Sequence, residues 1–429
     1  MGPIVWLITF FVLLFLTVPI GISIGMSIII YFTIYHTQPI SFLCQNMFTA
    51  CDSFPLMAIP FFVAGGALMT QGGITKRLVD LAEAVIGHVT GGFAMVTAIC
   101  CAFFGAISGS APATVAAIGS LMVPAMIERG YSKSFALALI ATSGCLGVII
   151  PPSIPMVIFG TTTGASVGTL FIAGIGPGIV FCLALCLYSY AICKKHGWKG
   201  NGQKFSIKKV GHELKNAIWA LLAPIIILGS IYGGICTPTE AAAICIVYAL
   251  IIGKFVYKEL DLKRTINSFW DGALTTGTIL IIVGTGTTLG RVLTVAKVPQ
   301  AVVGAILGVS ENPIVILLLL NLILLVVGCL METLSAIMIL GPILYPVAAA
   351  AGMDLIHFGI LMVVNLAVGF CTPPVGVNLF VAAGLRDDVS FTDLVKKAMP
   401  IVAILLIVLL IITFCRPVVM TIPGLLKNG

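Results

Sequence analysis

Two helix-breaking segments with matching local sequence lie far apart in an otherwise apolar chain. Residues 147–155 read GVIIPPSIP and residues 369–378 read GFCTPPVGVN, so each has a glycine four residues before a Pro-Pro pair. Proline removes a backbone donor and clashes with the preceding turn, so each pair is expected to interrupt a helix. Paired interruptions at corresponding places in two halves of a membrane chain indicate the binding site of a transporter.

The sequence around the two breaks repeats as well. Gly105 precedes the first Pro-Pro pair by 46 residues, and Gly328 precedes the second by 45. Pro124 and Pro346 follow these two glycines by 19 and 18 residues. We therefore predict two internal repeats, each made of a helical hairpin and a broken helix.

The composition is that of a membrane protein. Of the 429 residues, 60% are hydrophobic and only 9% are charged. A spanning helix needs about 20 apolar residues, and the apolar runs suggest roughly ten to twelve membrane segments. The alternating pattern of a β-barrel is absent, so we predict an all-α polytopic membrane protein. The expected units are residues 1–75 (scaffold), 76–192 (first repeat), 193–300 (basic loop and scaffold), 301–398 (second repeat) and 399–429 (C-terminal helix).

Lysine and arginine cluster in two loops. The formal net charge is +7, and an excess of Lys and Arg marks cytoplasmic loops, so nucleic acid is not needed to explain it. Two apolar spans separate the loops, which places both on the cytoplasmic side. The basic residues of these loops are Lys194, Lys195, Lys199, Lys204, Lys208 and Lys209, and then Lys254, Lys258, Lys263 and Arg264.

Charge also gives the two repeats opposite orientations. The turn at residues 128–133, after the first hairpin, is basic and falls on the cytoplasmic side. Its counterpart at residues 350–354 has no Lys or Arg and falls outside. Arg386 is expected on the cytoplasmic side, whereas Arg291 and Lys297 fall outside against the rule. Because no basic residue precedes the first apolar run, we expect the N-terminus to be a retained anchor.

The hairpin tips, at residues 103–114 and 327–335, are rich in small and hydroxyl-bearing residues. Helices broken near the middle of the bilayer leave carbonyls and amides without partners, and these are costly to bury. Carbonyl ends and hydroxyls suit a hard cation such as Na⁺. Amide ends, at the positive end of the helix dipole, suit a carboxylate.

We therefore expect two Na⁺ sites, one in each repeat. Close packing of small residues is the alternative reading of the same glycines and serines. The first set is Ser108, Gly109, Ser110, Gly147, Ile150 and Pro151. The second set is Gly328, Glu332, Thr333, Gly369 and Thr372.

A polar substrate between the breaks would meet hydroxyl and amide groups. The alternative role of these groups is to satisfy backbone atoms freed by the breaks. The candidate substrate-binding residues are Ser110, Thr114, Ser153, Thr333 and Asn378.

Few acidic residues lie near apolar segments, where a charge is costly and indicates function. Glu332 lies on a hairpin tip and is the strongest candidate, whereas Asp52 is expected at the interface. Glu240 follows Thr237 at the spacing of a capping box. Proton coupling is less favoured than sodium because no chain of Asp, Glu and His crosses the membrane. The histidines and the 13 cysteines show no metal-binding spacing.

These motifs, in order and over nearly the whole chain, resemble the large membrane subunit of tripartite ATP-independent periplasmic (TRAP) transporters. The motifs that carry the resemblance are IPFF at 59–62, AGG at 64–66, GGI at 72–74, SGSAPAT at 108–114, IPPSI at 150–154, AGIGPG at 173–178, TPTEA at 237–241 and TPPVGVNL at 372–379.

The resemblance implies a sodium-driven importer of small organic acids such as C4-dicarboxylates or sialic acids. It implies an elevator mechanism, in which a transport domain with both hairpins slides against a scaffold in the cell inner membrane. It also implies two partners that we expect outside this chain: a small four-helix membrane subunit and a periplasmic substrate-binding protein. The sequence has no P-loop, which agrees with an ion gradient as energy source.

Other classes are less favoured. An intramembrane enzyme would need a catalytic pair or a metal motif at apolar depth, and none is visible, so we expect no enzyme. A proton-coupled carboxylate transporter and a passive channel remain as alternatives, and sodium dependence of uptake would separate them from the preferred interpretation.

Overall fold

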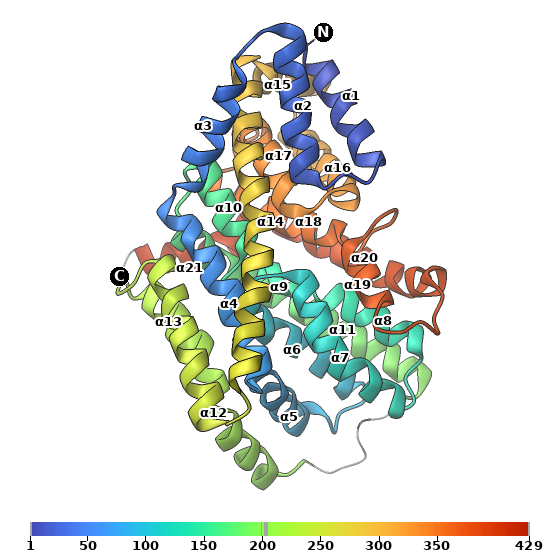
Figure 1. The fold of residues 1–429 in the computed structure, drawn as a ribbon. Coiled ribbons are helices and arrows are strands. Elements are labelled where there is room, and N and C mark those ends of the chain that lie inside the picture. The colour runs from blue at the N-terminus through green and yellow to red at the C-terminus, as the bar shows by residue number, and fades with distance from the viewer. Residues whose placement is uncertain (1, 199, 201–204, 428–429) are drawn as a thin grey trace.

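The computed structural model describes residues 2–198, 200 and 205–427, and in this part of the chain every regular element is a helix (Figure 1). Lys199 and Lys204 of the predicted basic loop lie outside the described residues. Nine of the described helices are long and apolar enough to span a membrane, and one bent pair of helices brings the number to ten. The all-α polytopic fold is confirmed, at the lower end of the expected number of spans.

The N-terminal apolar run is two helices rather than one. Helix α1 (Gly2–Phe15) and helix α2 (Ile20–Tyr35) are separated where Thr17 has a φ of 62° and Pro19 follows. Proline at this position lacks the amide that a continuous helix needs. The two helices pack against each other.

One long helix, α14 (Leu262–Val295), runs through the middle of the molecule (Figure 1). It packs against α2, α3, α4 and α17. It is longer than its apolar stretch because Asp261 caps its first turn and its polar N-terminal turns continue the helix. The other helices outside the repeats are α3 (Ile40–Cys51), η1 (Phe54–Met57), α4 (Ala58–Gln71), α5 (Ile74–Ile86), α12 (Ile207–Tyr232), α13 (Pro238–Ile251), η2 (Ile252–Val256) and α15 (Val298–Val309).

The first repeat contains the predicted hairpin and broken helix. Helices α6 (Gly92–Ser108) and α7 (Ala111–Glu128) form the hairpin. The broken helix consists of α8 (Lys133–Ser143), α9 (Leu146–Ile149) and α10 (Ile154–Thr163), bent by 42° at the Pro-Pro segment. The long helix α11 (Val167–His196) follows.

The second repeat has the same order of elements. Its hairpin is α16 (Pro313–Leu330) and α17 (Thr333–Ala350). Its broken helix is α18 (Leu355–Gly369) and α19 (Val377–Ala383), and the Pro-Pro pair lies between them. Helices α20 (Phe391–Phe414) and α21 (Arg416–Lys427) complete the chain. The two hairpins approach from opposite ends of the molecule, as Figure 1 shows, which agrees with the predicted inverted repeats.

Side-chain caps define where many helices begin. An oxygen of the capping residue accepts a hydrogen bond from a free amide in the first turn. The residues that do this are Ser132, Ser153, Ser166, Ser206, Thr237, Asp261, Asn312, Glu332, Asp354 and Ser390. The capping box predicted at Thr237 and Glu240 is confirmed, with both of its hydrogen bonds present.

Equivalent glycines pack the hairpin against the broken helix in both repeats. A Cβ added to Gly105 would lie 2.8 Å from the Cα of Gly147, and one added to Gly369 would lie 2.6 Å from the Cα of Gly328. Only glycine permits such close backbone approach. The sequence landmarks that revealed the repeat are therefore also its points of contact.

The two broken helices meet in the core. The Sγ atoms of Cys145 and Cys371, each two residues from a break glycine, lie 3.2 Å apart as free thiols. Asn378 Nδ2 donates to the carbonyl of Ala141 at 3.1 Å. These contacts join the repeats directly, so the two breaks are held in a fixed relation.

Candidate functional site

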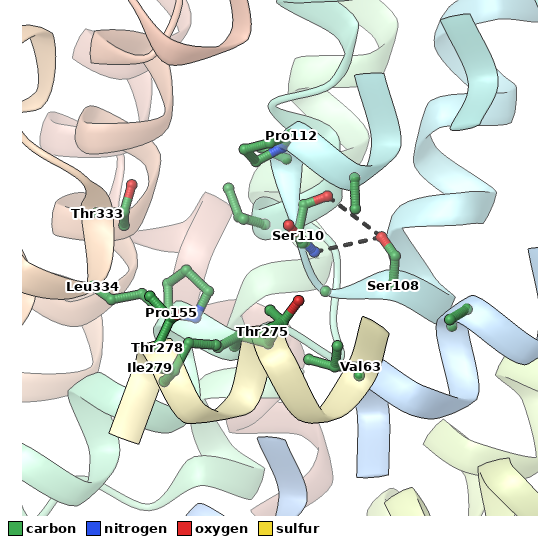
Figure 2. A pocket seen from close by; sticks show the side chains of 18 of the residues that line it. Val63, Ser108, Ser110, Pro112, Pro155, Thr275, Thr278, Ile279, Thr333 and Leu334 are labelled. Carbon is green, nitrogen blue, oxygen red and sulfur yellow. Dashed lines mark hydrogen bonds between the residues drawn. The ribbon is translucent and has the colours of Figure 1, made fainter. Parts of the chain in front are cut away.

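A cavity of about 540 Å³ lies between the tips of both hairpins and helix α14. Figure 2 shows Ser108 and Ser110 from the first tip, Thr333 and Leu334 from the second, and Thr275, Thr278 and Ile279 from α14. Helix α4 contributes a further wall through Val63, Gly66, Ala67 and Thr70. We call this space the central cavity.

The first hairpin tip gathers several oxygen atoms. Gly109 has a φ of 62° and ends α6, a conformation that glycine adopts readily. Ser108 Oγ lies 3.1 Å from Thr114 Oγ1 and accepts from the amide of Ser110 at 3.4 Å. Thr114 Oγ1 donates to the carbonyl of Ser110 at 2.8 Å. The tip is thus a compact group of hydroxyl and carbonyl oxygens.

The first break lies against this tip. The amide of Ile154 donates to the carbonyl of Gly109 at 3.3 Å. A Cβ added to Gly147 would lie 2.3 Å from Thr114 Oγ1 and 2.6 Å from the carbonyl oxygen of Ser110. The structure therefore brings Ser108, Gly109, Ser110 and Gly147 of the first predicted cation set together.

The other two residues of that set lie in the break itself. Pro151 is buried. The side chain of Ile150 faces away toward α11, because a Cβ added to Gly178 would lie 2.6 Å from its Cγ1. Their contribution to a cation site would come from backbone carbonyls.

The second tip is organised by an acid. Glu332 Oε2 accepts from the amides of Leu334 and Ser335 at 3.0 and 3.2 Å, so the carboxylate caps α17. A carboxylate at this position also interacts favourably with the helix dipole. Thr333 follows directly, and its buried Oγ1 has no hydrogen-bond partner in the described part of the chain. Both residues line the central cavity.

The second predicted cation set is less compact than the first. Gly328 and Gly369 are in backbone contact. Thr372 Oγ1 donates to the carbonyl of Val368 at 2.9 Å. Glu332 and Thr333 line the cavity, whereas Thr372 does not.

The predicted substrate residues divide into two groups. Ser110 and Thr333 line the central cavity. Thr114, Ser153 and Asn378 are fully buried and do not line it. Ser153 Oγ donates to the carbonyl of Val148 at 2.6 Å and accepts from the amide of Met156, so this hydroxyl serves backbone groups freed by the break.

Sequence reasoning missed the contribution of α14. Asp271, Thr275 and Thr278 lie on one face of this helix and line the central cavity. The sequence feature that could have indicated this role is an acid followed by threonines at helical spacing inside an apolar segment. Together with Glu332, Asp271 gives the cavity two carboxylates.

The groups that could hold a metal at this site are oxygen atoms. Among the described residues there is no cluster of three or more His, Cys, Asp or Glu side chains. Neutral hydroxyl and carbonyl oxygens are ligands that suit a hard cation rather than a transition metal.

Charged residues at the lysine-rich end form surface ion pairs. Arg386 Nη2 and Lys133 Nζ lie 2.7 and 2.6 Å from Asp388 Oδ2. Hydrogen bonds from Arg386 and then Lys133 hold the pKa of the Asp388 carboxyl well below its usual range. Arg386 therefore has a local partner and does not reach the central cavity.

Comparison with known proteins decides the family. Residues 7–418 match the family model described as "Tripartite ATP-independent periplasmic transporter, DctM component". The chain belongs to this family. It is a TRAP transporter large permease, and with its apolar helices it is a multi-pass protein of the inner membrane.

Relatives of this TRAP permease carry several substrate names. It is 48% identical to the isethionate TRAP transporter permease protein DctMQ of Oleidesulfovibrio alaskensis, over 90% of the chain and 61% of that protein. It is 37% identical to the C4-dicarboxylate large permease DctM of Pseudomonas aeruginosa, over 91% of each protein. It is also 37% identical to the sialic acid large permease SiaM of Vibrio cholerae, over 96% of each.

A solved structure shares the fold. The Alcanivorax borkumensis YdaH transporter superposes with a TM-score of 0.59 over 88% of both chains, at 14% sequence identity. At that identity the similarity concerns the fold of the TRAP permease alone.

Proposed function

We propose that this TRAP permease imports a small organic acid together with Na⁺ by an elevator mechanism. The observation that carries the proposal is the central cavity, in which the tips of two inverted hairpins meet the central helix α14. Sites at the interface of inverted repeats, built from broken helices, are typical of secondary transporters.

The first hairpin supports cation binding. Its hydroxyl and carbonyl oxygens are held within hydrogen-bonding distance of one another, and Gly147 leaves no side chain between them and the break. A Na⁺ ion near Ser108, Ser110 and Thr114 would satisfy oxygens that are otherwise paired only among themselves. A second ion would lie between Gly328, Gly369 and the Glu332–Thr333 tip.

The two hairpin helices differ in a way that orients the substrate. The N-terminus of α7 has no side-chain cap, and its first residues Ala111, Pro112 and Ala113 line the cavity. The N-terminus of α17 is already occupied by its own carboxylate, Glu332. A substrate anion therefore finds free amides and the positive end of a dipole at the first tip. The second tip offers no such free amides, because the Glu332 side chain already accepts from those of Leu334 and Ser335.

The substrate class follows from these features and from the relatives. Isethionate, C4-dicarboxylates and sialic acid, which appear in the names of the relatives, are all small organic anions. We include all three as test substrates. C4-dicarboxylates and sialic acids are the substrates that the sequence resemblance implies.

We propose two partners for the permease. The family is described as one component of a tripartite transporter, and the chain spans 61% of the length of the DctMQ relative. These facts support a small four-helix membrane subunit and a periplasmic protein that delivers the acid.

Proton coupling is the second candidate, because two carboxylates, Asp271 and Glu332, line the cavity. Glu332 accepts two amide hydrogen bonds at a helix N-terminus, so its carboxyl group is engaged as the cap of α17. The sequence has no chain of Asp, Glu and His across the membrane that would relay a proton, so sodium is the preferred ion.

The test is uptake by proteoliposomes that contain the permease with both partners. Isethionate, succinate and sialic acid are offered separately under a Na⁺ gradient, and then with K⁺ in place of Na⁺ with and without a pH gradient. We expect uptake of one acid only with Na⁺. Uptake driven by the pH gradient in K⁺ would instead establish proton coupling.

A substitution tests the placement of the site. Ser110→Leu fills the first tip and should abolish sodium-dependent uptake while expression persists. The same change at Ala273, on the opposite, exposed side of α14, is the control and should retain uptake. Unchanged sodium dependence in Ser110→Leu would remove the first tip from the site.

A further inference from the structure

Arg291 is a charge that the transport site does not explain. It lies in the last turns of α14, at the end of the molecule opposite the lysine-rich loops (Figure 1), where the charge bias of the sequence predicts few basic residues. Its side chain is exposed. The helix C-terminus favours a cation electrostatically, but that does not require an arginine here.

The other arginines of the described chain have acidic or carbonyl partners nearby. Arg77, Arg129, Arg386 and Arg416 each form an ion pair with an acid, and Arg264 donates to the carbonyl of Glu259. Arg291 forms no ion pair with a described acid, and its hydrogen bond goes to the neutral Oδ1 of Asn46. A guanidinium has five donors, so most of its capacity stays available.

This guanidinium lines a second cavity, of about 690 Å³, which we call the outer cavity. Its walls come from α3 and α14 on one side and from α10 and α17 on the other. Hydroxyl groups on several of these helices give the lining polar contacts for an anion or for water around it. The hydroxyl-bearing residues are Thr49, Ser53, Thr161, Thr162, Thr287 and Thr294.

The outer cavity and the central cavity are lined by residues one helical turn apart on α17. Residues Leu334, Met338 and Pro342 follow one face of α17, and the first lines the central cavity while the other two line the outer one. Met338 packs on Gly286 of α14, where an added Cβ would lie 2.9 Å from its own Cβ, and its Sδ accepts from Thr162 Oγ1 at 3.1 Å. A flexible methionine therefore lines the outer cavity one turn of α17 away from the central cavity.

We propose that the outer cavity is a capture site, in which Arg291 binds the negatively charged group of the transported acid before it passes Met338 into the central cavity. The inference rests on the proposed function for the identity of the anion. Asn46 holds the guanidinium in place, and the absence of a paired acid leaves its charge for the ligand. A planar guanidinium binds carboxylates and sulfonates through two parallel hydrogen bonds, whereas an ammonium acts as a point charge.

The first experiment measures the charge of the outer cavity without relying on transport. Thr287→Cys places a thiol in the cavity, and Gln38→Cys places one on an exposed loop outside it as control. The full chain in lipid nanodiscs is labelled with a sulfonate-bearing or a trimethylammonium-bearing thiosulfonate. Labelling at each position is quantified by peptide mass spectrometry, so the native cysteines do not interfere.

We expect the thiol at position 287 to prefer the anionic reagent relative to the control thiol. Arg291→Gln should lower this preference at least about threefold, because removal of a unit charge within several ångströms changes the local potential by that order. Millimolar isethionate, succinate or sialic acid, tested one by one, should slow anionic labelling for the acid that is bound. A preference unchanged by Arg291→Gln, or labelling that none of the three acids slows, would overturn the proposal.

The second experiment measures uptake by the complete transporter. Arg291→Gln should raise KM for the acid about tenfold and leave kcat nearly unchanged, and Arg291→Lys should restore part of the affinity. Equal KM values for the Gln variant and the unmodified protein would refute a capture role. If the unmodified protein transports none of the three acids, the proposed function fails, whereas the labelling result judges the outer cavity by itself.

Discussion

At the scale of single residues, the glycines of the breaks have no room for a side chain. A methyl group at Gly147 would overlap Thr114 Oγ1 and the carbonyl of Ser110. Neither neighbour can move without disturbing the first tip. Gly229, inside α12, has nothing within 4 Å of an added Cβ.

We therefore predict that Gly147→Ala lowers stability by about 1–3 kcal/mol, the usual cost of overpacking, and abolishes uptake. Gly229→Ala should be neutral or slightly stabilising, because alanine is the better helix former. Thermal unfolding of both purified variants in the same detergent checks the difference. Equal melting temperatures for the Gly147→Ala and Gly229→Ala variants would show that the first tip tolerates a side chain.

Glu332 is a residue whose structural role can be separated from its charge. Its carboxylate accepts two amide hydrogen bonds at the start of α17. Glu332→Ala should cost about 1 kcal/mol, as the loss of a helix cap does. Glu332→Asp should retain most of the stability, since aspartate also caps helices well. Thermal unfolding with and without Na⁺ distinguishes a helix cap from a residue of the Na⁺ site. If Glu332 is only a cap, its substitution lowers the stability by the same amount in both conditions.

Asp388 provides a prediction for pH. Its carboxyl pKa is lowered in the folded protein by Arg386 and Lys133, so its stabilising contribution is present above the unfolded pKa of about 3.9 and is lost as the pH falls through the lower folded value. Between pH 5 and 8 the stability difference between Asp388→Asn and the unmodified protein should stay constant and small, because the pair is exposed. A difference that changes across this range would contradict this assignment.

At the scale of elements, α14 presents a polar face to the central cavity within an otherwise apolar span. Thr275 and Thr278 lie on that face, whereas Ala273 lies on the opposite side of the helix and does not line the cavity. Thr275→Leu adds volume to the cavity wall without touching either hairpin.

We predict that Thr275→Leu reduces uptake at least about tenfold, since a leucine side chain in the cavity wall displaces both substrate volume and a polar contact. Ala273→Leu serves as the matched control and should transport normally. Initial rates of sodium-driven uptake give the comparison. Normal transport by Thr275→Leu would mean that the substrate does not approach α14.

The positions at which helices are interrupted could be predicted from the sequence. The residues of α14 that line the central cavity could not. Both Pro-Pro interruptions lie where expected, because proline acts on the backbone of its own helix and its effect is local. The division of the first apolar run at Thr17 and Pro19 could have been found by the same rule. The role of Asp271 and Thr275 could not be predicted in this way. Packing between residues far apart in sequence decides which face of α14 meets the hairpins.

The candidate site shows the same limit. Ser108, Ser110 and Gly147 were placed together correctly because the repeat predicts that a hairpin tip meets its own break. Asn378 and Ser153 are polar and close to the breaks, yet they are buried against Ala141 and Val148 rather than lining the cavity. Their position along the chain was informative, but the direction of their side chains was not.

At the scale of the whole molecule, the central question is whether the repeats move as one body against the scaffold. Cys145, Cys371 and Asn378 join the two broken helices in the core. By contrast, α14 meets α17 through a glycine and a flexible methionine, Gly286 and Met338. A contact between small and flexible side chains is one along which helices can slide, whereas a hydrogen-bonded core is not.

We therefore predict that a covalent link between these two helices stops transport. The Cβ positions of Gly286 and Met338 lie 2.9 Å apart, so a disulfide, which joins Cβ atoms about 3.5–4.5 Å apart, needs only a small adjustment. The double variant Gly286→Cys with Met338→Cys should lose uptake on oxidation and regain it with reductant, whereas Met338→Cys alone should respond to neither treatment. Continued uptake with the link fully formed, as judged by mass spectrometry, would mean that α17 and α14 do not slide past each other and that the elevator model is wrong for this permease.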